Sequence, residues 1–210
     1  MAGYVSDAVI RRLPGYYRYL KQLEKEGATQ ISSQELGARM NLTASQIRQD
    51  INCFGGFGRQ GYGYSVPELR ENIGRILGIN QIHSMIIVGA GNIGRAIANS
   101  DSFLDSGFQT TAIFDNDPEK IGDQIGGLTV EDMANIRQYI EDNKVDICIL
   151  SVPADTAQAV AEELCGYGVE AFWNFAPVDL KLPEGRVLMN VHLEEGLQEL
   201  SYRMLNKRPL

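Results

Sequence analysis

Residues 85–94 have the sequence MIIVGAGNIG, an apolar run that leads directly into three spaced glycines. The apolar part has the composition of a buried β-strand, and Gly89, Gly91 and Gly94 follow the pattern G-x-G-x-x-G. In this pattern the first glycine allows a tight turn, the second lets a pyrophosphate approach the backbone, and the third lets the helix pack against the sheet. The stretch therefore predicts a strand–turn–helix unit that binds a dinucleotide.

The chain beyond this stretch alternates between strand-like and helix-like segments. Apolar runs that predict further strands lie at 109–115, 145–153 and 169–177. Segments with helical character lie near 94–100, 131–142 and 154–166. This alternation is typical of a parallel sheet covered by helices. The predicted fold class is therefore α/β, with a Rossmann domain over residues 81–192.

Asp115 lies 21 residues after Gly94, at the end of the next predicted strand. A carboxylate there can accept hydrogen bonds from both ribose hydroxyls of an adenosine, and it would repel a 2′-phosphate. Since Asn116 and Asp117 bring no Arg, NAD⁺ and NADH are favoured over the phosphorylated cofactors. The alternative is a plain turn residue in the corner 115–118. The candidate cofactor-binding residues are Gly89, Ala90, Gly91, Asn92, Ile93, Gly94, Asp115, Ser151, Val152 and Pro153.

The same domain offers little for catalysis. A dehydrogenase needs a proton carrier near the nicotinamide, usually His, Lys or Tyr. Of the two histidines, His83 precedes the first predicted strand, away from the cofactor, and His192 lies just before the final helix. The segment 151–153 predicts a partly apolar wall at the nicotinamide, and no residues remain for a substrate domain. We predict a cofactor-binding protein that is not an enzyme. Two alternatives stay open: a small NAD-dependent oxidoreductase with a helical oligomerisation domain, and a dimer that binds another adenine ligand such as coenzyme A.

The first third of the chain has a different, mainly helical pattern. Apolar residues recur at three- and four-residue steps over 7–26, which predicts a helix with a kink or a fresh start at Pro14. The glycine- and aromatic-rich segment 55–64 predicts a short hairpin or wing. A further helix, expected to link two domains, begins near Pro67 and ends at Gly78.

Two capping boxes mark a pair of short helices between these segments. Ser32 with Glu35, and Thr43 with Gln46, have the spacing at which side chains and backbone N–H groups cap a helix start. They predict helices over 33–40 and 44–54. Two short helices joined by a tight turn after a longer helix are typical of a helix-turn-helix.

The helix predicted over 44–54 has the composition of a DNA-reading helix. Ile47, Ile51 and Phe54 share one face and are expected to be buried, which turns polar side chains outward. Such side chains read base edges in the major groove, and Arg also binds phosphate. An ordinary solvated helix face is the alternative. The candidate DNA-binding residues are Ser45, Gln46, Arg48, Gln49 and Asn52, with Arg59 of the predicted wing.

Charge and composition are consistent with this division. The chain has 210 residues, 44% of them apolar, and a net charge of −8. Residues 1–80 carry a net charge of +3 and the remainder −11, which favours a polyanion-binding N-terminal part. The three cysteines form no C-x-x-C motif, so neither disulfides nor a metal site is expected. Without an apolar run of spanning length or a signal segment, we expect a cytoplasmic protein that does not bind membranes.

Four segments together carry a resemblance to a known family. They are QIRQDINCFGGFGRQGYGY at 46–64, GAGNIG at 89–94, NFAP at 174–177 and LQELSYRM at 197–204. Their combination and order, over nearly the whole chain, resemble the Rex family of redox-sensing transcriptional repressors.

The resemblance implies a homodimer of three-part chains. An N-terminal winged-helix DNA-binding domain with its linker helix spans 1–80, a Rossmann NAD(H)-binding domain spans 81–192, and a C-terminal helix at 193–210 is swapped onto the partner. The resemblance also implies that the NADH/NAD⁺ ratio controls binding to double-stranded DNA with palindromic, inverted-repeat operators, upstream of genes for fermentation and respiration. NADH binding releases the DNA, and Asn174 of the NFAP segment is implied to lie at the cofactor.

Two positions depart from the family pattern. Members often carry a Tyr after the first Rossmann helix and an Asp at the start of the swapped helix. Together with an Arg that matches Arg18, these residues are implied to distinguish the oxidised from the reduced cofactor. Here these positions hold Ser100 and His192. Sensing through this set therefore uses other contacts, is weaker, or is lost. The residues expected in the redox switch and the dimer contact are Arg18, Ser100, His192, Leu197, Leu200 and Met204.

Overall fold

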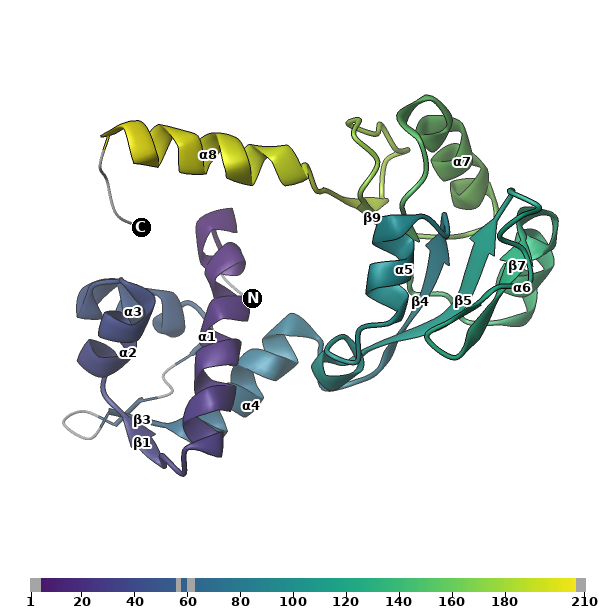
Figure 1. Cartoon of the computed structure of the whole chain (residues 1–210). Helices are drawn as coiled ribbons and strands as arrows, with labels where there is room; N and C mark the ends of the chain where they lie inside the picture. The colour runs from purple at the N-terminus through teal and green to yellow at the C-terminus, as the bar shows by residue number, and fades with distance from the viewer. Residues whose placement is uncertain (1–4, 56–57, 60–62, 207–210) are drawn as a thin grey trace. The chain divides into compact units, whose positions relative to one another are not determined.

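The structure is a computed structural model that describes residues 5–55, 58–59 and 63–206 (Figure 1). Its contacts divide the chain into two compact units, Met1–Gln81 and Ile82–Leu210. Each unit has a hydrophobic core of its own.

The first unit is a winged helix. Its four helices are α1 (Asp7–Lys25), α2 (Ser33–Met40), α3 (Ala44–Asn52) and α4 (Val66–Leu77). Its antiparallel sheet has the strand order β1 (Gln30–Ile31), β3 (Gly63–Ser65) and β2 (Gly58–Arg59). The predicted helix-turn-helix followed by a hairpin is confirmed, and α3 ends at Asn52, two residues earlier than predicted. The tip of the predicted wing lies outside the described residues.

Local capping explains where α2 and α3 begin. Ser32 Oγ accepts from the Glu35 N–H at 3.1 Å, and Glu35 Oε2 accepts from the Ser32 N–H at 2.9 Å, so this capping box is confirmed. Thr43 Oγ1 accepts from the Gln46 N–H at 3.2 Å and thereby supplies half of the second predicted box. Between the helices Asn41 adopts the left-handed conformation, which ends α2.

The core of the first unit contains buried side chains from α1, α2, α3 and α4. Fully or nearly fully buried apolar side chains come from each of them: Leu13, Tyr16, Leu20, Leu36, Ile47, Ile51, Leu69 and Ile73. The fresh start predicted at Pro14 is wrong, because α1 runs through this residue as one helix. Pro14 lies on the solvent-exposed side of α1, so the carbonyl group that it leaves without a backbone donor can be hydrated. Phe54, predicted to be buried, is only half-buried.

The second unit is built on a seven-stranded sheet. In spatial order its strands are β10 (Val187–Asn190), β9 (Ala171–Asn174), β8 (Ile147–Leu150), β4 (His83–Val88), β5 (Phe108–Asp115), β7 (Leu128–Asp132) and β6 (Gln124–Ile125). All neighbours are parallel except β6 and β7. After β4, the chain adds β5, β6 and β7 on one side of β4. It then crosses over and adds β8, β9 and β10 on the other side. The strand order therefore reverses between β4 and β8, which confirms the Rossmann prediction and locates the crevice used by ligands in such folds.

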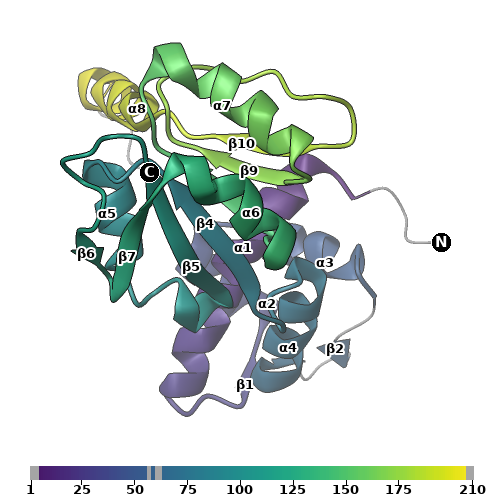
Figure 2. The ribbon, with the colours of Figure 1, turned by 90° about the vertical axis from the view of Figure 1, so that its right-hand side faces the viewer.

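Helices cover both faces of the central strands (Figure 2). They are α5 (Asn92–Ala98), α6 (Ile136–Asp142) and α7 (Ala154–Gly166), with short 3-10 turns η1 (Leu104–Ser106) and η2 (Met133–Asn135). Along β4, Ile86 and Val88 belong to the core beneath α6 and α7, and Met85 and Ile87 to the core beneath α5. Burial on both faces explains why β4 is a continuous apolar run.

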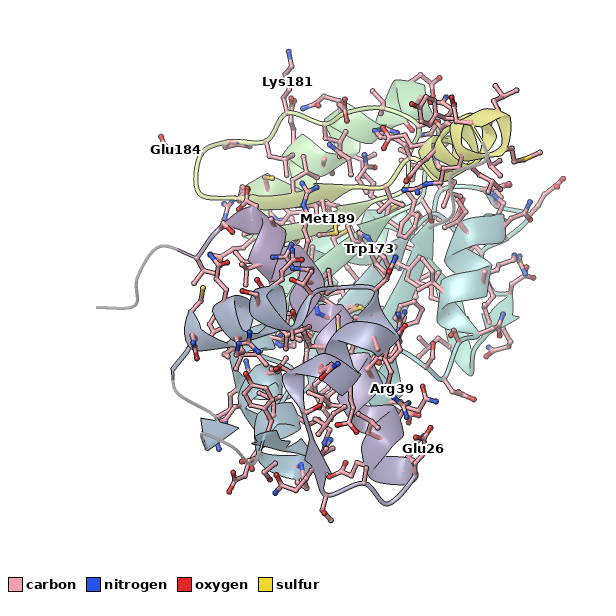
Figure 3. All side chains as sticks on the ribbon, turned by 90° about the vertical axis from the view of Figure 1, so that its left-hand side faces the viewer. Glu26, Arg39, Trp173, Lys181, Glu184 and Met189 are labelled. Atoms are coloured by element: carbon pink, nitrogen blue, oxygen red, sulfur yellow. The ribbon has the colours of Figure 1, made fainter. Side chains whose placement is uncertain are left out.

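Three outer strands of this sheet, the edge strands β6 and β10 and the penultimate strand β7, are not among the predicted strands. The start of the segment 131–142, predicted to be helical, belongs to strand β7. An edge strand such as β10 carries few buried side chains: Val187 and Met189 are 66% and 63% exposed. Met189 lies beside Trp173 across the β9–β10 pair (Figure 3). Edge strands of this kind lack the apolar run by which the central strands were predicted.

The last helix, α8 (Leu193–Asn206), has an apolar face that is not covered by the described part of the chain. None of its described side chains is buried, and Leu197, Leu200 and Met204 are 69%, 51% and 72% exposed. Among the described residues no helix is long and apolar enough to cross a membrane.

Replacement of Leu164 should selectively destabilise the second unit. Leu164 of α7 is fully buried in the core shared with β4, β5 and β8. Leu164→Ala should lower the free energy of unfolding of this unit by about 2–5 kcal/mol, because it removes apolar contacts and leaves a cavity. The only tryptophan of the chain, Trp173, reports on the unit by its fluorescence during urea unfolding. The exposed Glu162→Ala on the same helix should change this free energy by less than about 0.5 kcal/mol; equal losses in both variants would contradict the assignment of the core.

Candidate functional site

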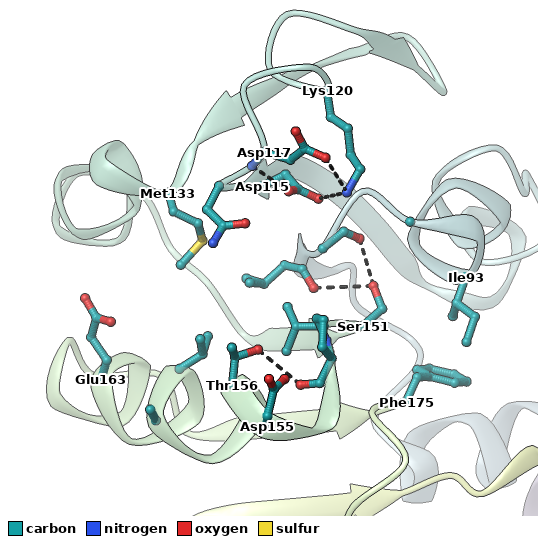
Figure 4. A pocket seen from close by; sticks show the side chains of 18 of the residues that line it. Ile93, Asp115, Asp117, Lys120, Met133, Ser151, Asp155, Thr156, Glu163 and Phe175 are labelled. Atoms are coloured by element: carbon teal, nitrogen blue, oxygen red, sulfur yellow. Dashed lines mark hydrogen bonds and ion pairs between the residues drawn. The ribbon is translucent and has the colours of Figure 1, made fainter.

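A cavity of about 1050 Å³ opens at the carboxyl ends of β4, β5 and β8 (Figure 4). This is the edge at which the strand order reverses. Its residues come from the end of β4 and the glycine turn with the start of α5, the corner after β5, η2, the end of β8, α7, and the segment after β9. They are Val88, Gly89, Gly91, Ile93, Asp115, Asn116, Asp117, Lys120, Met133, Ser151, Val152, Pro153, Asp155, Thr156, Ala159, Val160, Glu163, Phe175 and Pro177. Its size suits a dinucleotide better than a small metabolite.

The three glycines of the turn are required for different reasons. Gly89 has φ +101°, and a Cβ there would collide with the backbone of Ser151. A Cβ on Gly94 would collide with the carbonyl oxygen of Gly89. Gly91 has an ordinary φ of −77°, and nothing lies within 4 Å of where its Cβ would be. Packing therefore requires Gly89 and Gly94, whereas Gly91 leaves free space on the cavity side of the turn.

This free space suits a phosphate group. Gly91 begins α5 without a side-chain cap, so the first N–H groups of the helix have no capping partner from a side chain. Such N–H groups and the positive end of the helix attract anions. A pyrophosphate placed beside Gly91 would contact backbone rather than side chain, as the sequence pattern predicted.

Ser151 joins the end of β8 to the glycine turn. Its Oγ donates a hydrogen bond to the Gly89 carbonyl oxygen at 2.8 Å, and it lines the cavity with Val152 and Pro153. The hydroxyl is thus already used in holding the turn. The three residues form the partly apolar wall that the sequence predicted.

Asp115 joins the end of β5 to the same turn. Its carboxylate is 5% exposed and accepts from the Ala90 N–H at 2.7 Å and from the Asp117 N–H at 2.9 Å. The bond to Asp117 is the turn role weighed as an alternative. Since a carboxylate can accept about four hydrogen bonds, acceptor sites remain for ribose hydroxyls at the cavity.

Lys120 belongs to this corner but was not among the predicted residues. Its Nζ lies 3.2 Å from Asp117 Oδ2 and 3.4 Å from Asp115 Oδ2. Slight burial lowers the pKa of Lys120, but the hydrogen bond to Asp117 and the charge of Asp115 outweigh this, so the pKa is raised. Asn116 and Asp117 carry no positive charge, and the sequence signal for a cation at this corner is a Lys three residues after Asp117. Two carboxylates against one ammonium leave the corner negative, which disfavours a 2′-phosphate.

Asn174 lies outside the cavity. It is fully buried, its Nδ2 donates to the Val178 carbonyl oxygen at 2.8 Å and to Asn190 Oδ1 at 2.9 Å, and its Oδ1 accepts from the Ala176 N–H. These bonds position the NFAP segment, of which Phe175 and Pro177 do line the cavity. Ala90, Asn92 and Gly94 are also absent from the lining, although they shape the turn.

The residues implied in the redox switch each have a local partner. The guanidinium of Arg18 lies 5.2 Å from the centre of the Tyr19 ring, and Ser100 Oγ lies 2.8 Å from Ser102 Oγ. His192 Nε2 lies 3.0 Å from Asp179 Oδ1, and this hydrogen bond raises the pKa of His192. His192 occupies the short link between β10 and α8.

In the first unit, α3 presents a polar face. Ile47 and Ile51 are buried as predicted, whereas Ser45, Arg48, Gln49 and Asn52 are exposed and Gln46 is half-buried. Arg48 Nη1 donates to Ser33 Oγ at 3.0 Å, which holds this cation beside the start of α2. The side chain of Arg59 lies outside the described residues.

The described residues contain no cluster of three or more His, Cys, Asp or Glu that could hold a metal ion.

Comparisons with known proteins match both units. Residues 4–52 match the family described as "Putative DNA-binding protein N-terminus", and residues 80–178 match the family described as "CoA binding domain". The redox-sensing transcriptional repressor Rex of Thermoanaerobacter sp. (strain X514) is 52% identical, with 95% of this chain and 89% of the relative covered. The chain belongs to the Rex family. The Rex of Clostridium beijerinckii is 50% identical, with 97% of this chain and 96% of the relative covered.

Solved structures of a Rex-family repressor, RSP, have the same fold. RSP in complex with β-NAD⁺ and operator DNA is 50% identical, with a TM-score of 0.92 over 97% of this chain and 94% of RSP. RSP in complex with β-NADH is 48% identical, with a TM-score of 0.89 over 97% and 95%. The relatives named by these comparisons are transcriptional repressors, so the oxidoreductase alternative is not supported.

Proposed function

We propose that this protein is a DNA-binding transcriptional repressor that senses the NADH/NAD⁺ ratio and releases its operator when NADH occupies the cavity. The observation that carries the proposal is that one chain holds both a dinucleotide turn and an exposed polar recognition helix, and that its likeness to RSP extends over both. RSP has been crystallised with NAD⁺ and operator DNA and with NADH.

The cavity supports the cofactor part of this proposal. The uncapped start of α5 beside Gly91 would hold the pyrophosphate, and Asp115 would accept hydrogen bonds from the adenosine ribose. The nicotinamide would then lie against the apolar wall of Val152 and Pro153 and the ring of Phe175. The cofactor acts here as a ligand, so no proton carrier is needed.

The first unit supports the DNA part. Ser45, Gln49 and Asn52 would face base edges in the major groove, with Gln46 at their margin, while Arg48 and Arg59 would add contacts to phosphates or bases. In a homodimer the two copies of α3 would lie about one helical turn of DNA apart, so a palindromic operator is read.

The uncovered face of α8 supports a homodimer. Apolar side chains repeat along one side of this helix at Leu193, Leu197, Leu200 and Met204 and are exposed in the single chain. Burial of such a stripe against a second copy is the expected way to remove it from water. We place it on the partner as a swapped helix, with His192 at its hinge.

Coupling between cofactor and DNA follows from differential affinity. NADH and NAD⁺ differ in the charge of the nicotinamide ring. If the protein has two arrangements that surround this ring differently, the two cofactors will favour them to different degrees. If the arrangement that favours NADH holds the two copies of α3 out of register with the operator, NADH binding releases the DNA. Arg18, Ser100 and His192 are the residues that we place at this switch.

Substitution of Gly91 should separate cofactor binding from DNA binding. In Gly91→Val, NADH should no longer release the DNA, because the valine side chain fills the space proposed for the pyrophosphate. The fold should remain intact, since nothing lies within 4 Å of a Cβ at this position. The assay is the mobility of the inverted-repeat duplex that the parent protein enriches from a random library, with NADH, NAD⁺, NADPH or coenzyme A added. Gly94→Ala is the control for damage to the turn and should lower thermal stability. Full NADH sensitivity in Gly91→Val would contradict the cofactor assignment, and release by coenzyme A alone would favour that ligand.

Substitution of Arg48 should weaken DNA binding and leave cofactor binding intact, the reverse of the Gly91 substitution. Arg48→Ala should weaken binding to the same duplex by about tenfold, because it removes a charged contact to DNA, and should leave NADH affinity unchanged. The control is Arg137→Ala, which removes one cation from the exposed Arg137–Glu141 pair of the second unit and should leave DNA affinity unchanged. If both variants bind DNA like the parent, α3 is not the DNA-reading helix.

Charged substitutions on α8 should disrupt the dimer. Leu197→Glu with Leu200→Glu should shift the protein towards the monomer in analytical ultracentrifugation, because the paired charges cannot be buried at an apolar contact. Gln198→Glu with Ser201→Glu adds the same charge at exposed polar positions and should preserve the dimer. A parent protein that sediments as a monomer would contradict this part of the proposal.

A further inference from the structure

A buried carboxylate on the DNA-facing helix is held by two side chains of α1. Asp50 is 2% exposed, although it lies between Gln49 and Asn52 on α3. Arg12 Nε donates to Asp50 Oδ2 at 2.7 Å and Arg12 Nη2 donates to Asp50 Oδ1 at 2.8 Å. Tyr16 Oη, one helical turn further along α1, donates to Asp50 Oδ2 at 2.7 Å. We refer to Arg12, Tyr16 and Asp50 as the α1–α3 clamp.

The clamp is a weak source of stability. Desolvation of a buried ion pair costs about as much as its attraction returns, and apolar replacements of similar volume are often neutral or stabilising. Arg12 keeps a quarter of its side-chain surface exposed, which lessens its own desolvation, but Asp50 and Tyr16 are almost completely buried. The Tyr16 pKa is raised, first by burial and then by its hydrogen bond to Asp50, so the hydroxyl remains a donor.

The clamp is well suited to fixing orientation. A guanidinium that donates two parallel hydrogen bonds to one carboxylate fixes the plane and the direction of the pair, whereas apolar contacts such as those of Ile47 and Ile51 are not directional. Side chains of a helix reach about 5–6 Å from its axis, so a rotation of about 20° moves their ends by about 2 Å. Hydrogen bonds to base edges tolerate far less than this.

We infer that Arg12 and Asp50 are positioning residues that set the rotation of α3 and thereby the discrimination between operator and other DNA. The inference rests on the proposed function of α3 and adds a residue pair that never touches the DNA. Gln49 and Asn52, the neighbours of Asp50, are the side chains whose direction the clamp fixes.

The test replaces the clamp with apolar groups and compares two DNA affinities. Arg12→Met, Tyr16→Phe and Asp50→Leu together should retain the fold and its melting temperature, because they remove both charges and also the buried Tyr16 hydroxyl that would otherwise lose its acceptor. The probes are the inverted-repeat duplex that the parent protein enriches from a random library and a scrambled duplex of the same length, at one salt concentration. The ratio of the two affinities should fall by about tenfold, the effect of losing one well-aligned base contact. Affinity for the scrambled duplex, set by phosphate contacts, should not change.

The control is an ion pair that does not involve α3. Arg70 Nε of α4 lies 2.9 Å from Glu24 Oε2 of α1, and Arg70→Met with Glu24→Leu should leave the affinity ratio at the parent value. If this clamp variant does not fold, Arg12→Lys provides the test, since it keeps the charge and loses the paired geometry. It should lower the ratio by about threefold or more while melting like the parent.

The outcomes separate this inference from the function on which it rests. An affinity ratio within twofold of the parent in a folded clamp variant overturns the positioning role, provided that Arg48→Ala weakens operator binding. If the parent enriches no duplex, or if Arg48→Ala has no effect, the DNA-reading role of α3 fails, and the positioning role fails with it. A fall in the ratio that also occurs in the Arg70–Glu24 control would show a general loss of structure and would likewise overturn the inference.

Discussion

The hydrogen bond from the Ala90 N–H to the Asp115 carboxylate is the interaction on which the proposed cofactor site depends. It joins the ends of β4 and β5, and Ser151 joins the end of β8 to the same turn through the Gly89 carbonyl oxygen. A bond between an N–H and a buried charge contributes about 1.5–3 kcal/mol and is strongly directional. The turn is thus fixed from both sides, which holds Gly91 and the uncapped start of α5 in place before any ligand arrives.

The first unit uses a buried carboxylate in the same way. Asp50 fixes a helix as Asp115 fixes a turn, and in both cases charged or backbone donors satisfy an acid that is almost completely removed from water. Apolar packing supplies most of the stability of each unit, but it does not specify direction. The function that we propose for each unit requires direction, because N–H groups must face a phosphate in one unit and amide side chains must face bases in the other.

Some elements could be predicted from the sequence and others could not. The central strands, α7, the helix-turn-helix and the Ser32 capping box followed from short-range patterns, because their residues interact with near neighbours or are buried on both faces. The outer strands β6, β7 and β10 could not be predicted, since they are short and bury few side chains, and β7 and β10 are ordered by pairing with strands that are not their immediate neighbours along the chain. Lys120 was missed because its role depends on a corner that folds back towards Asp115.

The sequence by itself determined the fold class, the glycine turn, the polar face of α3 and the amphipathic character of α8, since each is a periodic or local property of the chain. Only the tertiary structure decided that Asn174 supports the cavity from outside it, that Gly91 alone among the three glycines leaves free space, and that Asp50 is buried against α1. The burial of Asp50 depends on contacts between segments far apart in the sequence, and the other two outcomes depend on how the chain folds around the cavity. Local propensity carries no information about which distant group will satisfy a buried polar atom.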